Sequence, residues 1–270
     1  MTLGSVKLTR SARVGLAMLA AFVAVGVVGP WLAPDDPQHI VLGARFLAPS
    51  TAHWLGTDSK GIDALSQLLY GARGALEVGV AVVAVTAIVG TAVGLVAGWF
   101  GGAVDEVAMR IVDVMMAFPG VLMNIAIVAT VARPSLGMTI AALCANGWVG
   151  YARLVRGEVL SLRERDFVTA SLALGASSGH VIRKHLAPNV VGPVLIQAAF
   201  GLGGAILAEA SLSFLGLGPQ LDYSWGAMLE QGTAFLWKPG FAHYALAPGL
   251  ALMWVVIAAN LARDGLADRR

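Results

Sequence analysis

The sequence predicts an all-α integral membrane protein with six transmembrane helices. Of its 270 residues, 57% are hydrophobic before the 33 glycines are counted, and 13% are charged. Soluble domains average about 45–50% apolar with glycine included and ~25% charged. The mean hydropathy of +0.76 and the net charge of +2 argue against a soluble enzyme, a disordered chain and a nucleic-acid-binding protein. The single cysteine, Cys144, excludes a disulfide framework and a thiolate metal cluster.

Charge-free windows locate the spans. A bilayer core of ~30 Å needs about 20 apolar residues in a helix. Asn146 dilutes the fourth window and Pro193 the fifth, but each window is long enough to cross. The expected spans are residues 14–34, 78–104, 114–132, 134–152, 190–208 and 239–262.

The first window is expected to remain in the mature protein rather than to be a cleaved secretory signal. It is long, it contains Pro30 and Pro34, and no small-x-small cleavage site follows it. Lys7, Arg10 and Arg13 precede it, and basic residues are retained on the cytoplasmic side. The N-terminus is therefore predicted to be cytoplasmic.

Six spans from that start place both termini in the cytoplasm. The chain has 18 lysines and arginines, and most of them then lie inside, as the positive-inside rule requires. Those outside are Arg45, Lys60, Arg73, Arg133 and Lys238. Two outside loops are long, 35–75 and 216–243, and the first is expected to carry a short surface helix at 63–71.

Glycines recur every four residues along the second window, at Gly90, Gly94, Gly98 and Gly102. That spacing aligns them on one helix face and lets another helix approach closely. The approaching helix belongs either to the same chain or to a second membrane subunit.

A loop of about 35 residues, 153–188, joins the fourth and fifth spans on the predicted cytoplasmic side; connections of this length are usually functional. The sequence predicts a first short helix that Asp166 can cap and that Gly175 ends in a left-handed conformation.

A second short helix is expected to begin at Ser177 or Ser178 as its cap, and Pro188 marks the turn into the fifth span. Both helices have apolar faces that lipid cannot cover at this place. Either the ends of the chain's own helices cover them or a cytoplasmic partner with a groove for an amphipathic helix does.

The segment DFVTASLALGASSGHVIRKHLAPN, residues 166–189, resembles the "EAA" loop of ABC-importer permeases. Its alanine, glycine and proline match that motif at the right spacing, whereas a threonine replaces the usual glutamate and a histidine stands where isoleucine is usual. The candidate ATPase-coupling residues that follow from this resemblance are Thr169, Ala170, Ser171, Gly175, His185 and Pro188.

The resemblance extends over most of the chain. HWLGTDSKGIDALSQLLYGAR is similar to the segment before the second span in permeases of the dipeptide, oligopeptide and nickel class, with Ile62 in place of an arginine. The chain order of the matching segments is that of the second, C-type subunit. Further matches are MRIVDVMMAFPG, YARLVRGEVLSLRERDFV, AILAEASLSFLGLG, SWGAML and PGLALMWVVIAANLARDGLADR.

This resemblance implies a type I ABC-importer permease fold with a cytoplasmic coupling helix. One permease domain is expected over residues 1–270, with an N-terminal span at 14–34, a core at 74–264 and the coupling loop at 153–188. The implied partners are a homologous second permease, two cytoplasmic ATPases, an extracytoplasmic solute-binding protein and membrane lipid, with no nucleic acid. The implied location is the bacterial inner membrane.

The cargo implied is dipeptides or oligopeptides, or else nickel or another metal as a chelate. The chain itself is expected to bind no cofactor, because ATP and magnesium belong to the ATPase subunits. The sequence agrees with this division, since it contains no G-x-x-x-x-G-K-[ST] phosphate-binding loop. The permease is therefore expected not to be an enzyme.

Two charged residues near the spans are candidates for function. Asp113 is expected to pair with Arg110, one turn away. Glu209 follows the fifth window and is expected near the outer interface. There it either lines the mouth of the translocation path or hydrogen-bonds a neighbouring helix.

Two other functions stay open. A secondary transporter would need ion sites in broken helices and would work without ATPases. An intramembrane hydrolase would use Ser177, because GASSG fits the nucleophile-elbow pattern G-x-S-x-G. The five histidines are scattered, and no span carries metal-ligand spacing. A bare metal ion is therefore not the expected cargo.

Overall fold

The structure, a computed structural model, describes residues 9–131, 134–219, 223–238 and 241–267. Regular structure in these residues is helical; the extended pairing found there is one isolated bridge between Thr57 and Asp63. The all-α prediction is confirmed. Four of the basic residues used to orient the chain, Lys7, Arg133, Arg269 and Arg270, lie outside the described residues.

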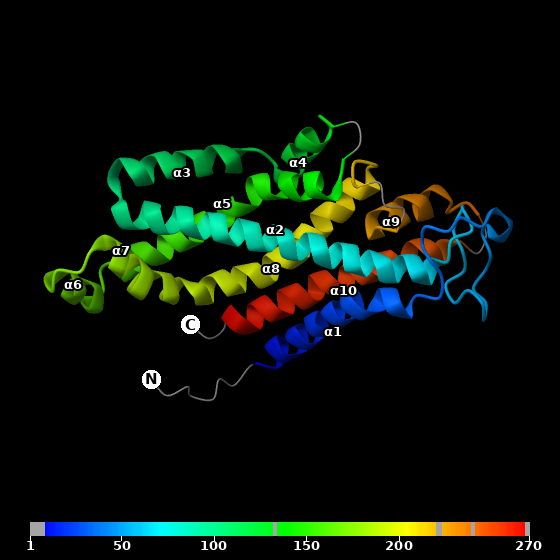
Figure 1. The fold of residues 1–270 in the computed structure, drawn as a ribbon, viewed down its shortest axis with the longest axis horizontal. Coiled ribbons are helices and arrows are strands. Elements are labelled where there is room, and N and C mark those ends of the chain that lie inside the picture. The colour runs from blue at the N-terminus through cyan, green and yellow to red at the C-terminus, as the bar shows by residue number, and fades with distance from the viewer. Residues whose placement is uncertain (1–8, 132–133, 220–222, 239–240, 268–270) are drawn as a thin grey trace.

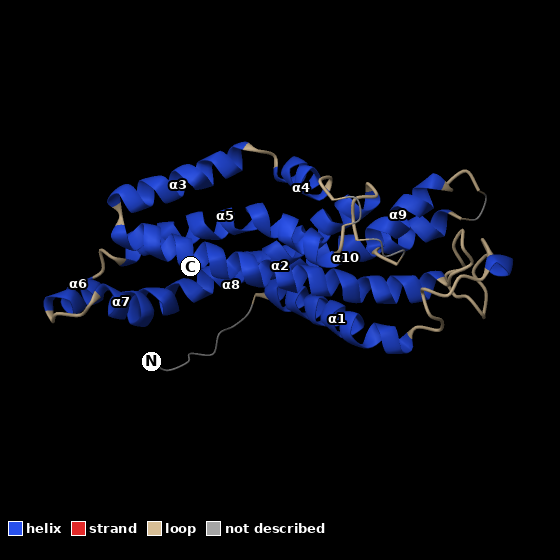
Figure 2. Ribbon diagram, turned by 45° about the horizontal axis from the view of Figure 1, so that its top comes forward, coloured by secondary structure: helices blue, strands red, loops and turns tan. Residues whose placement is uncertain are grey.

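The long helices run side by side along one axis, with α6 and α7 at one end and α9 with the loop before α2 at the other (Figure 1). Connecting segments are concentrated toward the two ends (Figure 2). The helices are α1 (Arg10–Leu32), α2 (Ala64–Phe100), α3 (Gly102–Ala117), α4 (Gly120–Val128), α5 (Leu136–Leu162), α6 (Asp166–Ala173), α7 (Ser178–Val181), α8 (Ala187–Phe214), α9 (Trp225–Ala234) and α10 (Ala242–Ala267), with a 3-10 turn at Leu42–Ala44 and a π-turn at Ile182–Leu186.

Four helices are apolar and long enough to cross a bilayer: α1, α2, the continuous helix Ser178–Phe214 that contains α8, and α10. The pair α3 and α4 makes a fifth span if it is counted as one. Helix α5 has 27 residues, enough to cross, but it does not reach the same apolar composition. The expectation of six spans is thus supported in part.

The third expected span is broken. Helices α3 and α4 meet at an angle of 84°. Pro119 lies at the break and is the N-cap of α4, and proline cannot continue the hydrogen bonding of a preceding helix. The Asn146 side chain of α5 donates to the Gly120 carbonyl at 3.2 Å, which ties the start of α4 to α5.

The expected surface helix at 63–71 does not exist as a separate element. Asp63 caps α2, its carboxylate accepting from the Ser66 backbone at 2.8 Å, and the helix then runs unbroken to Phe100. Its 37 residues extend about 55 Å at ~1.5 Å each, well beyond the bilayer core. Gly71 lies inside α2, close to Trp225 of α9.

Helix α2 is packed closely against α5. A Cβ atom at Gly90, Gly94 or Gly98 would lie 2.4, 2.6 or 2.8 Å from atoms of α5. Three of the four recurring glycines therefore lie against a helix of the same chain. The prediction that Gly102 shares their helix is wrong, because α2 ends at Phe100 and Gly102 begins α3 with a φ of +51°.

The first and last helices bring the two ends of the described chain together. Helices α1 and α10 are in extensive contact, and the Thr9 hydroxyl donates to the Gly265 carbonyl at 3.3 Å. The start of α1 and the end of α10 lie toward the end of the molecule that carries α6 and α7 (Figure 1).

Candidate functional site

The loop between α5 and α8 folds as two short helices, as its sequence predicts. Gly175 separates them with a φ of +83°, a conformation that favours glycine. The Ser177 side chain caps α7 by accepting from the His180 backbone at 3.4 Å. Asp166 is not the cap of α6 as expected. Arg165 holds that position without a side-chain bond, and Asp166 is the first helical residue.

One face of this loop packs on its own chain. Val168 of α6, Val181 of α7 and Leu186 are fully buried. The Arg163 guanidinium donates to the Gly98 carbonyl at the end of α2, at 3.3 Å. The cluster that covers this face includes Val155, Val159 and Val190 with the partly buried Leu95, Trp99, Leu162, Ala176, Ile182 and Val194. The helix ends of the chain thus cover one of the two faces.

The opposite face carries apolar side chains that stay exposed among the described residues. Leu174, next to Gly175, is 90% exposed. Phe167 and Leu172 are also exposed, and the exposed cations Arg183 and Lys184 lie in the same loop. We call Phe167, Leu172 and Leu174 the loop patch. An exposed apolar patch of this kind is suited to a protein partner.

The six residues drawn from the EAA resemblance lie in or next to this loop: Thr169, Ala170 and Ser171 in α6, Gly175 after it, His185 in the π-turn and Pro188 at the start of α8. Thr169, Ala170, Gly175 and Pro188 are exposed, whereas Ser171 and His185 are half-buried. The His185 and Phe167 rings are 5.9 Å apart. A helix, α6, precedes the GASSG segment in place of the strand that a nucleophile elbow requires. The Ser177 hydroxyl accepts the cap bond.

A polar cavity of about 210 Å³ lies between α2, α4, α5 and α8. Amide and hydroxyl side chains from all four helices line it, and no carboxylate, imidazole or thiol does. The polar lining residues are Thr86, Asn124, Asn146, Tyr151 and Gln197. Sequence reasoning missed this site, because each helix contributes one or two polar residues within an apolar stretch. Those isolated polar residues were the available signal.

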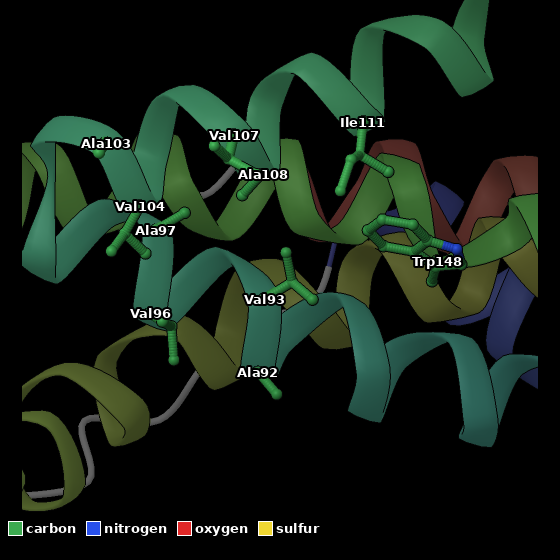
Figure 3. A pocket seen from close by; sticks show the side chains of 10 residues that line it. All are labelled: Ala92, Val93, Val96, Ala97, Ala103, Val104, Val107, Ala108, Ile111 and Trp148. Atoms are coloured by element: carbon green, nitrogen blue, oxygen red, sulfur yellow. The ribbon is translucent and has the colours of Figure 1, made fainter.

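A larger cavity, of about 690 Å³, is lined by apolar side chains and by Trp148, whose indole N–H donates to the Ala145 carbonyl at 2.9 Å. It lies between α2 and α3, where Val107, Ala108 and Ile111 point toward α2 and Trp148 of α5 stands at one end (Figure 3). A solute that needs hydrogen bonds would find none from these side chains.

Two ion pairs hold α3 against α5. Arg156 makes two bonds to the Asp105 carboxylate, at 2.8 and 2.5 Å. Arg153 pairs with Asp113 at 2.5 Å. The prediction that Asp113 pairs with Arg110 is therefore wrong, since α5 brings an arginine from far along the chain to the same carboxylate.

Glu209 is buried near the end of α8. Its carboxylate accepts from the Ser213 hydroxyl, on the same helix, at 2.6 Å. Glu209 is not among the residues that line the polar cavity.

At the other end of the molecule, the structure brings together a set that sequence spacing did not suggest. Ligand atoms of Asp35, His53 and Asp63 lie within 4.8 Å of one another. The His53 ring is 3.0 Å from Asp63, and the second Asp63 oxygen accepts from the Ser66 backbone and hydroxyl. These hydrogen bonds give the cluster a structural role, because they anchor the loop 35–63 to the start of α2.

The sequence matches known membrane proteins over nearly its whole length. Residues 90–270 match the family described as "Binding-protein-dependent transport system inner membrane component". The chain is 39% identical over 263 residues to the dipeptide transport system permease protein DppC of Alkalihalophilus pseudofirmus, covering 97% of this chain and 86% of that protein. It is 38% identical to DppC of Bacillus subtilis, covering 97% and 82%. It is 36% identical to the nickel transport system permease protein NikC of Escherichia coli K12, covering 96% and 92%.

Proposed function

The chain belongs to the binding-protein-dependent transport system inner membrane components, the permease subunits of ABC importers, and from this we propose that it carries small peptides into the cytoplasm. The observation that supports this cargo most directly is similarity over nearly the full length to dipeptide permeases. A nickel chelate is the second candidate, because the chain is also similar to a nickel permease.

The importer that we propose has two permeases, two ATPases and an extracytoplasmic binding protein. This chain contributes six spans as one domain, with α3 and α4 together forming the third and α5 the fourth. Both termini are cytoplasmic. The neighbouring positions of the two chain ends, at the α6–α7 end of the molecule, support that topology.

The ATPases move this permease through their contacts with the α6–α7 loop. Its inner face is fixed to the ends of α2, α5 and α8, so a force applied to the loop reaches the spans. Its outer face offers the loop patch, which a groove on the ATPase would cover. ATP binding changes the permease only if the ATPases bind this loop differently in the two states. ATP and magnesium are bound by those partners, since the sequence has no phosphate-binding loop.

Disabling the ATPases tests this division of labour. We expect peptide uptake by the complete importer in proteoliposomes to be abolished when the phosphate-loop lysine of both ATPases is replaced, since this chain cannot hydrolyse ATP. Binding of the solute-loaded binding protein to the vesicles should persist. Concentrative uptake that survives the change would instead identify a secondary transporter.

Glu209→Gln separates a role in the translocation path from the hydrogen bond that the structure shows, which joins Glu209 to Ser213 of the same helix and not to the neighbouring helix considered from the sequence. The substitution keeps the oxygen that accepts from Ser213 and removes the charge. If Glu209 only packs against its own helix, uptake should stay within about twofold of wild type, because the hydrogen bond of ~1 kcal/mol is retained. Ser213→Ala is the matched control for that bond. A large fall in uptake by Glu209→Gln alone, with ATPase binding intact, would assign the carboxylate to the pathway.

A further inference from the structure

The polar cavity between α2, α4, α5 and α8 contains buried polar atoms that have no hydrogen-bond partner among the residues that the structure describes. Asn124 is 5% exposed and Tyr151 is 3% exposed. The Asn124 side-chain oxygen accepts no hydrogen bond, and the Tyr151 hydroxyl, although it interacts with Thr86, makes none of good geometry. Both residues line the cavity.

Such atoms are costly inside a membrane protein. An unsatisfied polar group buried away from water costs about 1–3 kcal/mol, a cost that a hydrogen-bonding molecule in the cavity would remove. Thr86 does not need the cavity, because its hydroxyl donates to the Val82 carbonyl at 2.7 Å. The side-chain oxygen of Asn124 differs, because it has no donor among the described residues and can accept from a molecule that enters the cavity.

The cavity is of useful size and is accessible. Its volume of about 210 Å³ would hold about seven waters at ~30 Å³ each, or a portion of a small peptide. Phe200 and Gly204 of α8, which belong to the lining, are exposed. A Cβ atom at Gly204 would meet nothing within 4 Å, so this part of the wall faces open space.

The chemistry of the lining selects a neutral hydrogen-bonding ligand. Amides and hydroxyls match the N–H and C=O groups of a peptide bond. A bare divalent cation would require carboxylate, imidazole or thiolate ligands, and the lining supplies none. The side-chain amide oxygen of Asn124, which has no donor among the described residues, can accept from an N–H group of such a ligand.

We propose that this cavity is a hydrogen-bonding site for the peptide backbone of the passing solute, in which Asn124 accepts from a peptide N–H. The proposal rests on the proposed function of peptide import and assigns to it a place and a chemistry. Tyr151 and Gln197 supply the further hydrogen-bonding groups on the facing helices.

The test compares a dipeptide with its depsipeptide analogue, in which an ester oxygen replaces the amide N–H, in proteoliposomes containing the complete importer. The ratio of the two uptake rates is measured for wild type and for Asn124→Leu. The binding protein delivers each compound equally well to wild type and to the variant, so its own preference for one compound cancels when the two ratios are compared. We expect the peptide-to-depsipeptide ratio to fall about five- to tenfold in Asn124→Leu, which corresponds to the loss of one hydrogen bond.

An unchanged ratio would overturn the site, even if both rates fell together. A wild-type importer that takes up neither compound would be a different failure, because it would overturn the peptide cargo itself. Co-purification of the variant with its ATPases in wild-type amounts shows that it folds.

A second pair of variants tests the cavity without touching the hydrogen-bonding groups. Gly204→Leu should obstruct the open side of the cavity and lower peptide uptake at least about fivefold. Gly192→Leu, on the same helix and also with open space around its Cβ position, lies outside the lining and should leave uptake unchanged. Equal uptake by the two variants would contradict a role for the cavity.

Discussion

Replacing Leu174 by glutamate is expected to release the ATPase subunits from the permease while leaving the permease folded. Leu174 is 90% exposed at the tip of the α6–α7 loop, so its side chain contributes little to the fold. In an apolar groove, a central leucine contributes about 2 kcal/mol or more to binding. A buried, unpaired carboxylate would add a further cost. We expect the affinity for the ATPases to fall at least about 30-fold, measured by co-purification and by titration of purified ATPase.

Leu42→Glu is the matched control. Leu42 is 66% exposed and belongs to the loop between α1 and α2. That loop lies at the opposite end of the molecule from α6 and α7 (Figure 1), so the same change of an exposed leucine to glutamate should leave ATPase binding at the wild-type level. Normal ATPase binding by Leu174→Glu would show that the loop patch is not the docking surface. An equal loss in both variants would point to a general defect in the permease.

The local parts of this loop could be predicted because short-range rules determine them. A glycine that ends one helix and a serine that caps the next are favoured by backbone geometry within a few residues, and the structure has both at Gly175 and Ser177. The cap of α6 was less predictable, since Arg165 and Asp166 differ by a single position and helix ends vary by that much.

Features that depend on distant parts of the chain could not be read from the sequence. The 84° bend between α3 and α4 is a different case, because Pro119 is a local signal that a hydropathy window averages over. Asp113 had an arginine one turn away, yet Arg153 of another helix pairs with it. Asn124 and Tyr151 are ordinary polar residues until four helices bring them to one cavity.

The glycine spacing predicted close packing but did not identify the partner helix. Gly94→Val tests the packing of α2 against α5 that the structure shows. A Cβ atom at Gly94 would lie 2.6 Å from the Ala152 carbonyl oxygen and 2.7 Å from the Val155 Cβ atom. Backbone and Cβ atoms cannot turn aside as a flexible side chain does, so α2 and α5 would have to separate along their contact. We expect a loss of about 3 kcal/mol or more, seen as a lower midpoint of thermal unfolding in detergent.

Gly74→Val distinguishes this cost from the weak helix propensity of valine. Gly74 lies in the same helix, and a Cβ atom there would meet nothing within 4 Å. Glycine and valine differ little in helix propensity, so Gly74→Val should unfold near the wild-type temperature. Because both variants add the same atoms to α2, the difference between their midpoints measures only the contact with α5. Equal midpoints would mean that α2 and α5 do not need bare backbone where they meet.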